Sequence, residues 1–163
     1  KGTFDPVSEE GLDYSGIAKG YAVEKVAELL EKNDIANYFV EIGGEISAKG
    51  SKYSQPWVFG VEIPSEDENG AYMAFKVPET GISVATSGEY REPGHIWGAG
   101  PRDIVSVTVA DADAASADAW ATALYVAGAE EGIALAEAND LAVFFILLDG
   151  SSKQSGNWGK IFP

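Results

Sequence analysis

The sequence predicts an α+β fold in which helices pack on a largely antiparallel sheet. Three observations support this class. A segment at 17–32 carries apolar residues at helical spacing, and several short apolar runs are separated by Pro, Gly and Asn. The longest apolar run, LAVFFILL at 141–148, is far shorter than a bilayer span and suits a buried strand. The chain has the length of one ordinary domain, so residues 1–163 are expected to form a single domain.

The expected elements alternate between helices and strands along the chain. In the first helix, 17–32, apolar side chains recur at 22, 23, 26, 29 and 30. Strands bounded by turn signals are then predicted at 37–42, 57–63, 72–77, 82–87 and 103–110. The helix of AASADAWATALYVAG at 114–128 follows, with Ser116 as its expected N-cap. A short helix at 130–138 comes after Gly128, and LAVFFILLD at 141–149 is expected to close the sheet.

The acidic composition restricts the ligands that the chain can bind. It has 26 Asp and Glu against 11 Lys and Arg, for a net charge of −15. Such a chain repels nucleic acid, so no nucleic-acid partner is expected. An anionic ligand would need a helix N-terminus, a local Lys or Arg, or a metal ion. The chain has no Cys, which excludes disulfides and thiolate metal sites.

The first candidate site is a polar pair inside the apolar helix at 114–128. Asp118 and Thr122 are four residues apart, so on a helix they share one face. One reading is a solvated stripe, or a hydroxyl that bonds back to its own helix. The other reading is a pair of oxygen ligands for one cation. The spacing alone leaves both readings open.

Two Gly-containing segments are further candidates. In LDYSGIAKGYAVEKV, at 12–26, a small-residue turn at Ser15 opens a helix that carries Lys19 early on, an arrangement suited to phosphate. An ordinary helix start with a surface Lys would look the same. In VEIGGEISAKG, at 40–50, two glycines allow close backbone approach to a ligand or strand, although a plain turn is the simpler reading.

Two later segments offer hydroxyls and the single histidine. VATSGEYRE, at 84–92, places Thr86, Ser87 and Gly88 at a strand end, where they could hold phosphate or ribose, or form an ordinary turn. GHIWGAGP contains the one histidine, His95, in a Gly-rich neighbourhood that indicates a formed, exposed loop. A lone histidine is more often structural than catalytic.

The order of these segments carries more information than any one of them. The chain resembles the ApbE family, the FAD:protein FMN transferases once labelled thiamine-biosynthesis lipoproteins. The motifs that carry the resemblance span nearly the whole chain and read DYSGIAKGYA at 13–22, EIGG at 41–44, ATSGEY at 85–90, HI at 95–96 and ADAWATAL at 117–124. The resemblance implies an ApbE-like, T-fold-like core that lacks the family's N-terminal portion, so residues 1–163 would be a partial flavin transferase domain.

The resemblance also implies an activity and a metal site. Family members bind FAD with Mg²⁺, cleave its pyrophosphate, and attach FMN to a Thr or Ser hydroxyl of an acceptor protein while AMP leaves. The matching metal ligands here are the Gly16 carbonyl, Asp118 and Thr122. Matching flavin-binding positions are Thr3, Phe4, Asp5, Asp13, Lys19 and Trp97. His95 and Asp118 are the candidate general bases.

The chain also departs from the family pattern. The family continues after its histidine with Asp-Pro-x-Thr-Gly, whereas here Ile96 is followed by WGAGP. The segment that joins FDP at 4–6 to Asp13 is short. Two alternatives therefore stand beside transfer: a non-catalytic or degenerate flavin-binding domain, and an FAD pyrophosphatase that releases FMN and AMP without an acceptor.

The resemblance extends to partners and compartment. By family, the acceptors resemble flavin-carrying subunits of redox-driven sodium pumps and related membrane electron-transfer systems. That implies an extracytoplasmic, membrane-anchored full-length protein, although no anchor or signal is visible in this chain.

Overall fold

The computed structural model describes residues 14–63, 70–90, 93–98 and 100–163. Its centre is a six-stranded sheet in the order β1-β2-β7-β8-β9-β10, in which every neighbouring pair is antiparallel. The expected α+β class with a largely antiparallel sheet is thereby confirmed. The six strands are β1 (Tyr38–Ile42), β2 (Glu45–Lys49), β7 (Ile82–Gly88), β8 (Ile104–Asp111), β9 (Ala142–Leu147) and β10 (Ser152–Gln154).

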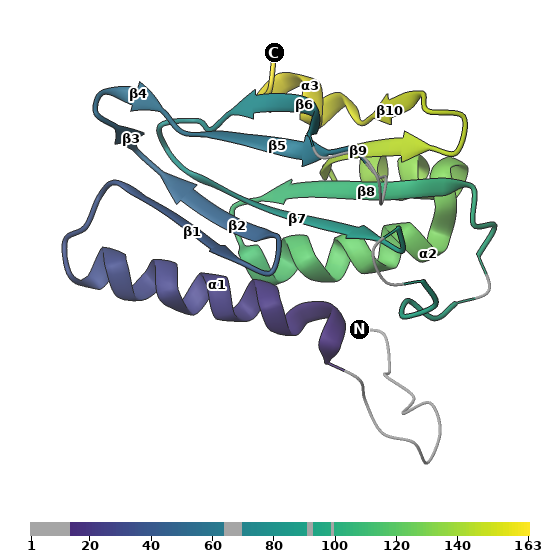
Figure 1. Ribbon diagram of the computed structural model, residues 1–163, viewed down its shortest axis with the longest axis horizontal. Coiled ribbons are helices and arrows are strands. Elements are labelled where there is room, and N and C mark those ends of the chain that lie inside the picture. The colour runs from purple at the N-terminus through teal and green to yellow at the C-terminus, as the bar shows by residue number, and fades with distance from the viewer. Residues whose placement is uncertain (1–13, 64–69, 91–92, 99) are drawn as a thin grey trace.

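The two long helices cover one face of this sheet, and smaller elements cover the other (Figure 1). The helix side holds α1 (Ser15–Lys32) and α2 (Ala114–Ala138). The opposite side holds the hairpin of β5 (Val58–Glu62) and β6 (Ala71–Lys76), with α3 (Gly156–Ile161). A small hairpin of β3 (Ser51–Lys52) and β4 (Gln55–Pro56) joins β2 to β5. In the described part of the chain, no helix combines the length and apolarity needed to cross a bilayer.

Strand β9 shows why the apolar run at 141–148 is continuous. Val143 and Phe145 belong to the core under α2, whereas Phe144 and Ile146 belong to the core beneath the β5–β6 hairpin and Trp158. Alternate side chains of a strand point to opposite faces, so a strand covered on both faces needs apolar residues at every position. The prediction of a buried strand here is confirmed. The prediction that it closes the sheet is wrong, because β10 pairs along its outer side.

The start of α2 differs from the prediction. Its N-cap is Asp113, whose carboxylate accepts a 2.7 Å hydrogen bond from the Ser116 amide. Ser116 lies inside the helix, and its hydroxyl donates to Asp111. The expected N-cap at Ser116 is therefore wrong by three residues. At Gly128 the backbone leaves helical geometry (φ 80°, ψ −177°), and the helix resumes to Ala138, so the predicted second helix is present as the far part of α2.

Two further details were not anticipated. β2 follows directly on the Gly43–Gly44 turn, in a segment for which only a turn was predicted. In α1 the buried positions are Gly20, Val23 and Ala27, whereas Leu29, a member of the predicted apolar set, is 59% exposed. The helix itself was predicted correctly, but of the five predicted apolar positions only Val23 is buried, because the helix turns its small residues Gly20 and Ala27 inward instead.

Candidate active site

Two glycines of α1 face the two polar residues of α2 in matching register. The Gly20 amide donates a 2.8 Å hydrogen bond to Asp118 Oδ2. A Cβ atom at Gly20 would lie only 2.3 Å from the Ala114 carbonyl oxygen and 2.6 Å from the Asp118 Cβ. One turn earlier, a Cβ at Gly16 would lie 3.1 Å from Thr122 Oγ1. The absence of side chains at both positions therefore lets the helices approach and brings α1 backbone to Asp118 and Thr122.

Asp118 is buried, so the Asp118–Thr122 pair is not a row of solvent-exposed polar side chains on the helix surface. Asp118 is 3% exposed, and Thr122 lies beside the sheet, with its hydroxyl 3.4 Å from Ser87 Oγ. Burial raises the pKa of the Asp118 carboxyl, while the Gly20 amide and the charge of Lys19 act in the opposite direction. The expected common face is confirmed. Asp118 contacts Gly20 and Thr122 lies next to Gly16, so both residues point toward the first turns of α1.

Lys19 is held beside this pair by a carboxylate that the sequence did not single out. Its Nζ donates a 2.7 Å hydrogen bond to Glu45 Oε1. Glu45 is 1% exposed, and its Oε2 is buried without a hydrogen-bond partner among the described residues. The Gly43 turn has a positive φ of 64°, and a Cβ there would lie 3.2 Å from Lys19 Cδ. The Gly43–Gly44 segment is therefore both a turn and a place of close approach.

The electrostatics of the cluster favour a cation. Burial raises the pKa of the Glu45 carboxyl; Lys19 opposes this rise and the nearby charge of Asp118 adds to it. Lys19, whose side chain is about half exposed, pairs with the buried Glu45 and acts on the buried Asp118 through its charge. Within the described ranges, no three His, Cys, Asp or Glu side chains form a metal-binding group. A cation at Asp118 would accordingly need neutral oxygens as its other ligands, and Mg²⁺ accepts such a mixed set and keeps several waters.

The geometry also bears on the Gly16 carbonyl. In a regular helix this carbonyl would accept its hydrogen bond from the Gly20 amide. That amide has a single hydrogen, and it donates a hydrogen bond to Asp118 Oδ2. The bond to Asp118 competes for this hydrogen, which leaves the Gly16 carbonyl more available to another partner. Asp118, Thr122 and the Gly16 backbone are therefore compatible with one small cation.

Other predicted residues are placed less centrally. His95 and Trp97 lie in the loop between β7 and β8; both are exposed, Trp97 to 87%. The Thr86 and Thr108 hydroxyls hydrogen-bond at 2.9 Å, and Thr86 points to the opposite face of β7 from Ser87. Thr86 thus does not join the cluster. Four predicted flavin-binding positions, Thr3, Phe4, Asp5 and Asp13, lie outside the described residues.

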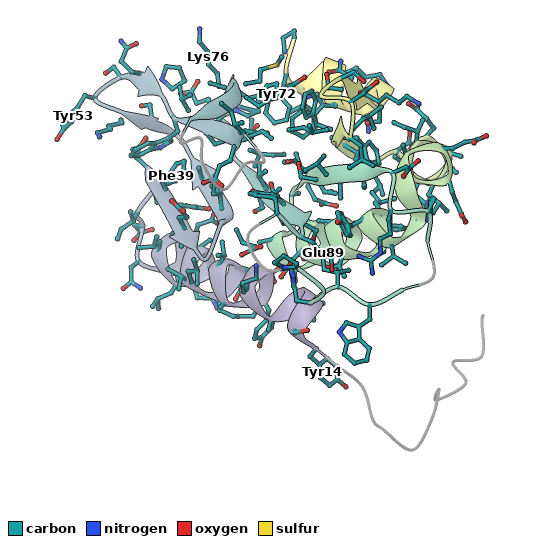
Figure 2. All side chains as sticks on the ribbon, turned by 45° about the vertical axis from the view of Figure 1, so that its right-hand side comes forward. Tyr14, Phe39, Tyr53, Tyr72, Lys76 and Glu89 are labelled. Carbon is teal, nitrogen blue, oxygen red and sulfur yellow. The ribbon has the colours of Figure 1, made fainter. Side chains whose placement is uncertain are left out.

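Sequence reasoning missed two acidic residues, Glu45 and Glu89. Figure 2 shows Glu89 on the helix-covered side of the sheet, and its carboxylate accepts hydrogen bonds from the Ile96 amide at 3.2 Å and the Tyr125 hydroxyl at 3.4 Å. Glu45 directly follows Gly43–Gly44, and Glu89 directly follows Gly88. Their position beside these glycines is the only feature of the sequence that could have drawn attention to them. Neither partner set could be read from the sequence: the Lys19–Glu45 and Glu89–Tyr125 contacts join segments far apart in the chain, and the contacts of Glu89 with Ile96 and Arg102 depend on how the loop after β7 folds back.

An aromatic groove of about 530 Å³ lies elsewhere on the molecule. Tyr53, one of its lining residues, stands in the turn of the β3–β4 hairpin (Figure 2). The groove is lined by Phe39, Lys52, Tyr53, Gln55, Pro56, Trp57 and Val58. These residues belong to β1, the β3–β4 hairpin and the start of β5, and none of them is part of the Asp118 cluster.

The family is decided by a match over most of the chain. The model of the ApbE family matches residues 4–145, which include every motif of the cluster. The chain belongs to the ApbE family. Its ApbE relatives include the FAD:protein FMN transferase of Vibrio cholerae, 39% identical over 157 residues, which covers 86% of this chain and 46% of the relative. The FAD:protein FMN transferase of Haemophilus influenzae is 36% identical over 150 residues, covering 83% of this chain and 43% of the relative.

Solved ApbE structures share the fold. The flavin transferase ApbE of Vibrio cholerae superposes with a TM-score of 0.82 at 37% identity, over 94% of this chain and 53% of that protein. The apo flavinyl transferase ApbE of Pseudomonas stutzeri gives a TM-score of 0.79 at 33% identity, over 93% of this chain and 53% of that protein. The chain thus has the ApbE-like core and spans about half the length of these relatives.

Replacing Glu45 with Gln is expected to stabilise the protein in alkaline solution. The raised pKa of Glu45 means that the folded state favours the protonated acid. The contribution of Glu45 to stability is therefore largest below its unfolded pKa, and it is lost as the pH rises through its folded pKa. The Glu45→Gln variant should gain about 1 kcal/mol in free energy of unfolding at about pH 8, and this gain should be smaller at about pH 5. Urea unfolding at both pH values measures this difference.

Glu31 provides a control of opposite sign. It accepts hydrogen bonds from Lys49 and the Tyr38 hydroxyl, and these hold the pKa of its carboxyl below the usual value. Glu31→Gln should therefore lose stability on the alkaline side. A Glu45→Gln variant that is less stable than wild type at alkaline pH would show that the Lys19 contact outweighs the cost of burial.

Proposed function

We propose that this chain carries the transfer centre of an FAD:protein FMN transferase, which moves FMN from FAD to a Thr or Ser hydroxyl of an acceptor protein in a Mg²⁺-dependent reaction and releases AMP. The observation that carries the proposal is the register of α1 on α2, which brings Asp118, Thr122 and the Gly16 backbone together with Lys19 close by. Membership of the ApbE family and relatives named FAD:protein FMN transferase support the same activity.

In this proposal the Gly16 carbonyl, Asp118 and Thr122 hold Mg²⁺. When bound there, the ion acts as a Lewis acid on the pyrophosphate and offsets part of its charge. Asp118 is the charged ligand, while the backbone carbonyl and the hydroxyl contribute neutral oxygens. Lys19 adds positive charge at the same place, which lets a chain of net charge −15 accept an anionic dinucleotide.

The chemistry needs positioning and charge neutralisation more than covalent help from the protein. The acceptor oxygen forms a bond to the phosphorus on the FMN side, the bond from that phosphorus to the bridging oxygen breaks, and AMP leaves. The hydroxyl proton passes to a base on the protein. Of the two candidates, His95 is favoured over Asp118, because a carboxylate that binds a metal is a poor proton acceptor.

The remaining assignments are also part of the proposal. Thr3, Phe4, Asp5, Asp13 and Trp97 would contact the flavin nucleotide. The acceptor would be a flavin-carrying subunit of a membrane redox complex, and the full-length protein would work outside the cytoplasm on a membrane anchor.

A flavinylation assay tests the proposal. The chain is incubated with FAD, Mg²⁺ and such an acceptor subunit, and intact-mass spectrometry reads the acceptor. We expect an FMN-sized mass gain that EDTA abolishes and one AMP per adduct. FMN and AMP without an adduct would favour the pyrophosphatase alternative, and FAD binding without turnover would favour the non-catalytic one. Either outcome contradicts transfer.

A further inference from the structure

The loop that carries His95 and Trp97 is held at Ile96 by hydrogen bonds that involve Glu89. The Ile96 amide donates to Glu89 Oε1 at 3.2 Å. Arg102 pairs with Glu89 through one guanidinium nitrogen and donates from the other to the Ile96 carbonyl at 2.9 Å. Both backbone groups of Ile96 are therefore fixed, one directly by Glu89 and the other through its Arg102 partner.

The packing of Ile96 orients its two neighbours. Ile96 is 7% exposed and belongs to the core under α2, together with Tyr125. His95 and Trp97, on either side of it, are both exposed. With Ile96 buried and its backbone bonded, the two neighbouring side chains project outward from a fixed point rather than from a free loop.

The same carboxylate places this loop against the helix face of the candidate site. Glu89 Oε2 also accepts from the Tyr125 hydroxyl at 3.4 Å. Tyr125 follows Thr122 by three residues and Asp118 by seven, so all three lie along one face of α2. On the sheet side, Ser87 approaches Thr122, and Glu89, two residues further along the chain, reaches Tyr125.

Glu89 is suited to this role because it is largely shielded. Its side chain is 16% exposed, and its oxygens accept from an amide, a guanidinium and a phenol. Hydrogen bonds to a charged acceptor in such a setting are stronger than exposed ones. Its charge also contributes to the raised pKa of the Tyr125 phenol, after the larger effect of burial.

We propose that Glu89 is a positioning residue that presents His95 and Trp97 at the end of the Asp118–Thr122 face. This role rests on the proposed transfer function. Through Ile96 and Arg102, Glu89 fixes the positions of the His95 and Trp97 side chains. Their positions are set relative to Asp118 and Thr122 on α2. A small misplacement of such groups costs far more in rate than in stability.

The test compares Glu89→Ala and Glu89→Gln with Glu31→Ala. Glu31 is the matched control, because it also accepts from a tyrosine hydroxyl and pairs with a cation, but at the other end of α1. Two readouts are taken: amide hydrogen exchange at Ile96 without ligand, and kcat per folded molecule at saturating FAD. A merely structural role would lower the folded fraction and leave kcat per folded molecule intact.

We expect Glu89→Ala to speed exchange at Ile96 and to lower kcat by about 10- to 100-fold. Glu89→Gln, which still accepts from the Ile96 amide, should recover part of both, and Glu31→Ala should change neither. A Glu89→Ala variant with wild-type exchange at Ile96, or with wild-type kcat, would overturn the proposal while wild-type transfer still upholds the function. A wild-type chain that transfers nothing would overturn the proposed function and, with it, this role.

Discussion

Replacing Asp118 with Asn is expected to abolish most metal-dependent transfer while leaving the fold intact. Asn keeps an oxygen that can accept from the Gly20 amide, so the contact between α1 and α2 survives. It removes the charge that a divalent cation requires from the one carboxylate of the ligand set. Transfer at a fixed Mg²⁺ concentration should fall roughly 100- to 1,000-fold. The measurement is the initial rate of acceptor flavinylation over a Mg²⁺ titration.

The Asp118→Asn variant should be more stable than wild type at neutral pH, although it is less active. Burial raises the pKa of the Asp118 carboxyl, so the charged form costs folding free energy at neutral pH, and the neutral amide removes that cost. Glu131→Gln, at an exposed position of the same helix, is the matched control and should change neither activity nor stability. Retained Mg²⁺-dependent transfer in Asp118→Asn or Asp118→Ala would show that the ligand assignment is wrong.

Replacing Gly20 with Ala should damage both the fold and the site. The added methyl group would stand 2.3 Å from the Ala114 carbonyl oxygen and 2.6 Å from the Asp118 Cβ, and backbone cannot move aside as a side chain can. The helices must separate, at a cost of about 2 kcal/mol after the better helix propensity of Ala is counted. Because the separation also moves Asp118 from the Gly20 amide, transfer should fall at least about tenfold. Thermal unfolding and the flavinylation rate measure the two effects.

Gly159→Ala separates the steric effect from helix propensity. Gly159 is also helical, but its added methyl group would meet only the flexible end of Gln154, at 3.1 Å. This variant should be as stable as wild type or slightly more so, and fully active. If Gly20→Ala matched it in both measurements, the close approach of α1 and α2 would not matter to the site.

The features that the sequence could predict are those set by local periodicity. The four-residue spacing of Asp118 and Thr122 placed them on one face, and the structure puts that face against α1. The unbroken apolar run at 141–148 indicated a strand buried on both sides, which β9 is. The Gly43–Gly44 pair indicated a turn, or a close approach to a ligand or strand; it forms the turn, and the close neighbour of Gly43 is the Lys19 side chain.

The features that escaped prediction depend on contacts that a segment makes with other parts of the chain. DADAAS at 111–116 offers several capping residues, and the choice of Asp113 over Ser116 depends on where β8 ends. The partner of the buried Glu45 is Lys19, which comes from a helix 26 residues earlier in the chain. β10 (Ser-Lys-Gln) has no apolar residue, so its strand state follows from pairing with β9 and not from its own composition.

The central claim is that Asp118, Thr122 and the Gly16 carbonyl bind one divalent cation. The most direct measurement is a crystal structure of the chain with FAD and Mn²⁺, which accepts the same oxygen ligands as Mg²⁺ and gives an anomalous signal. We predict one anomalous peak with these three oxygens at about 2.1 Å, next to the pyrophosphate. A peak at another place, or none here at a Mn²⁺ concentration that supports transfer, would contradict the account.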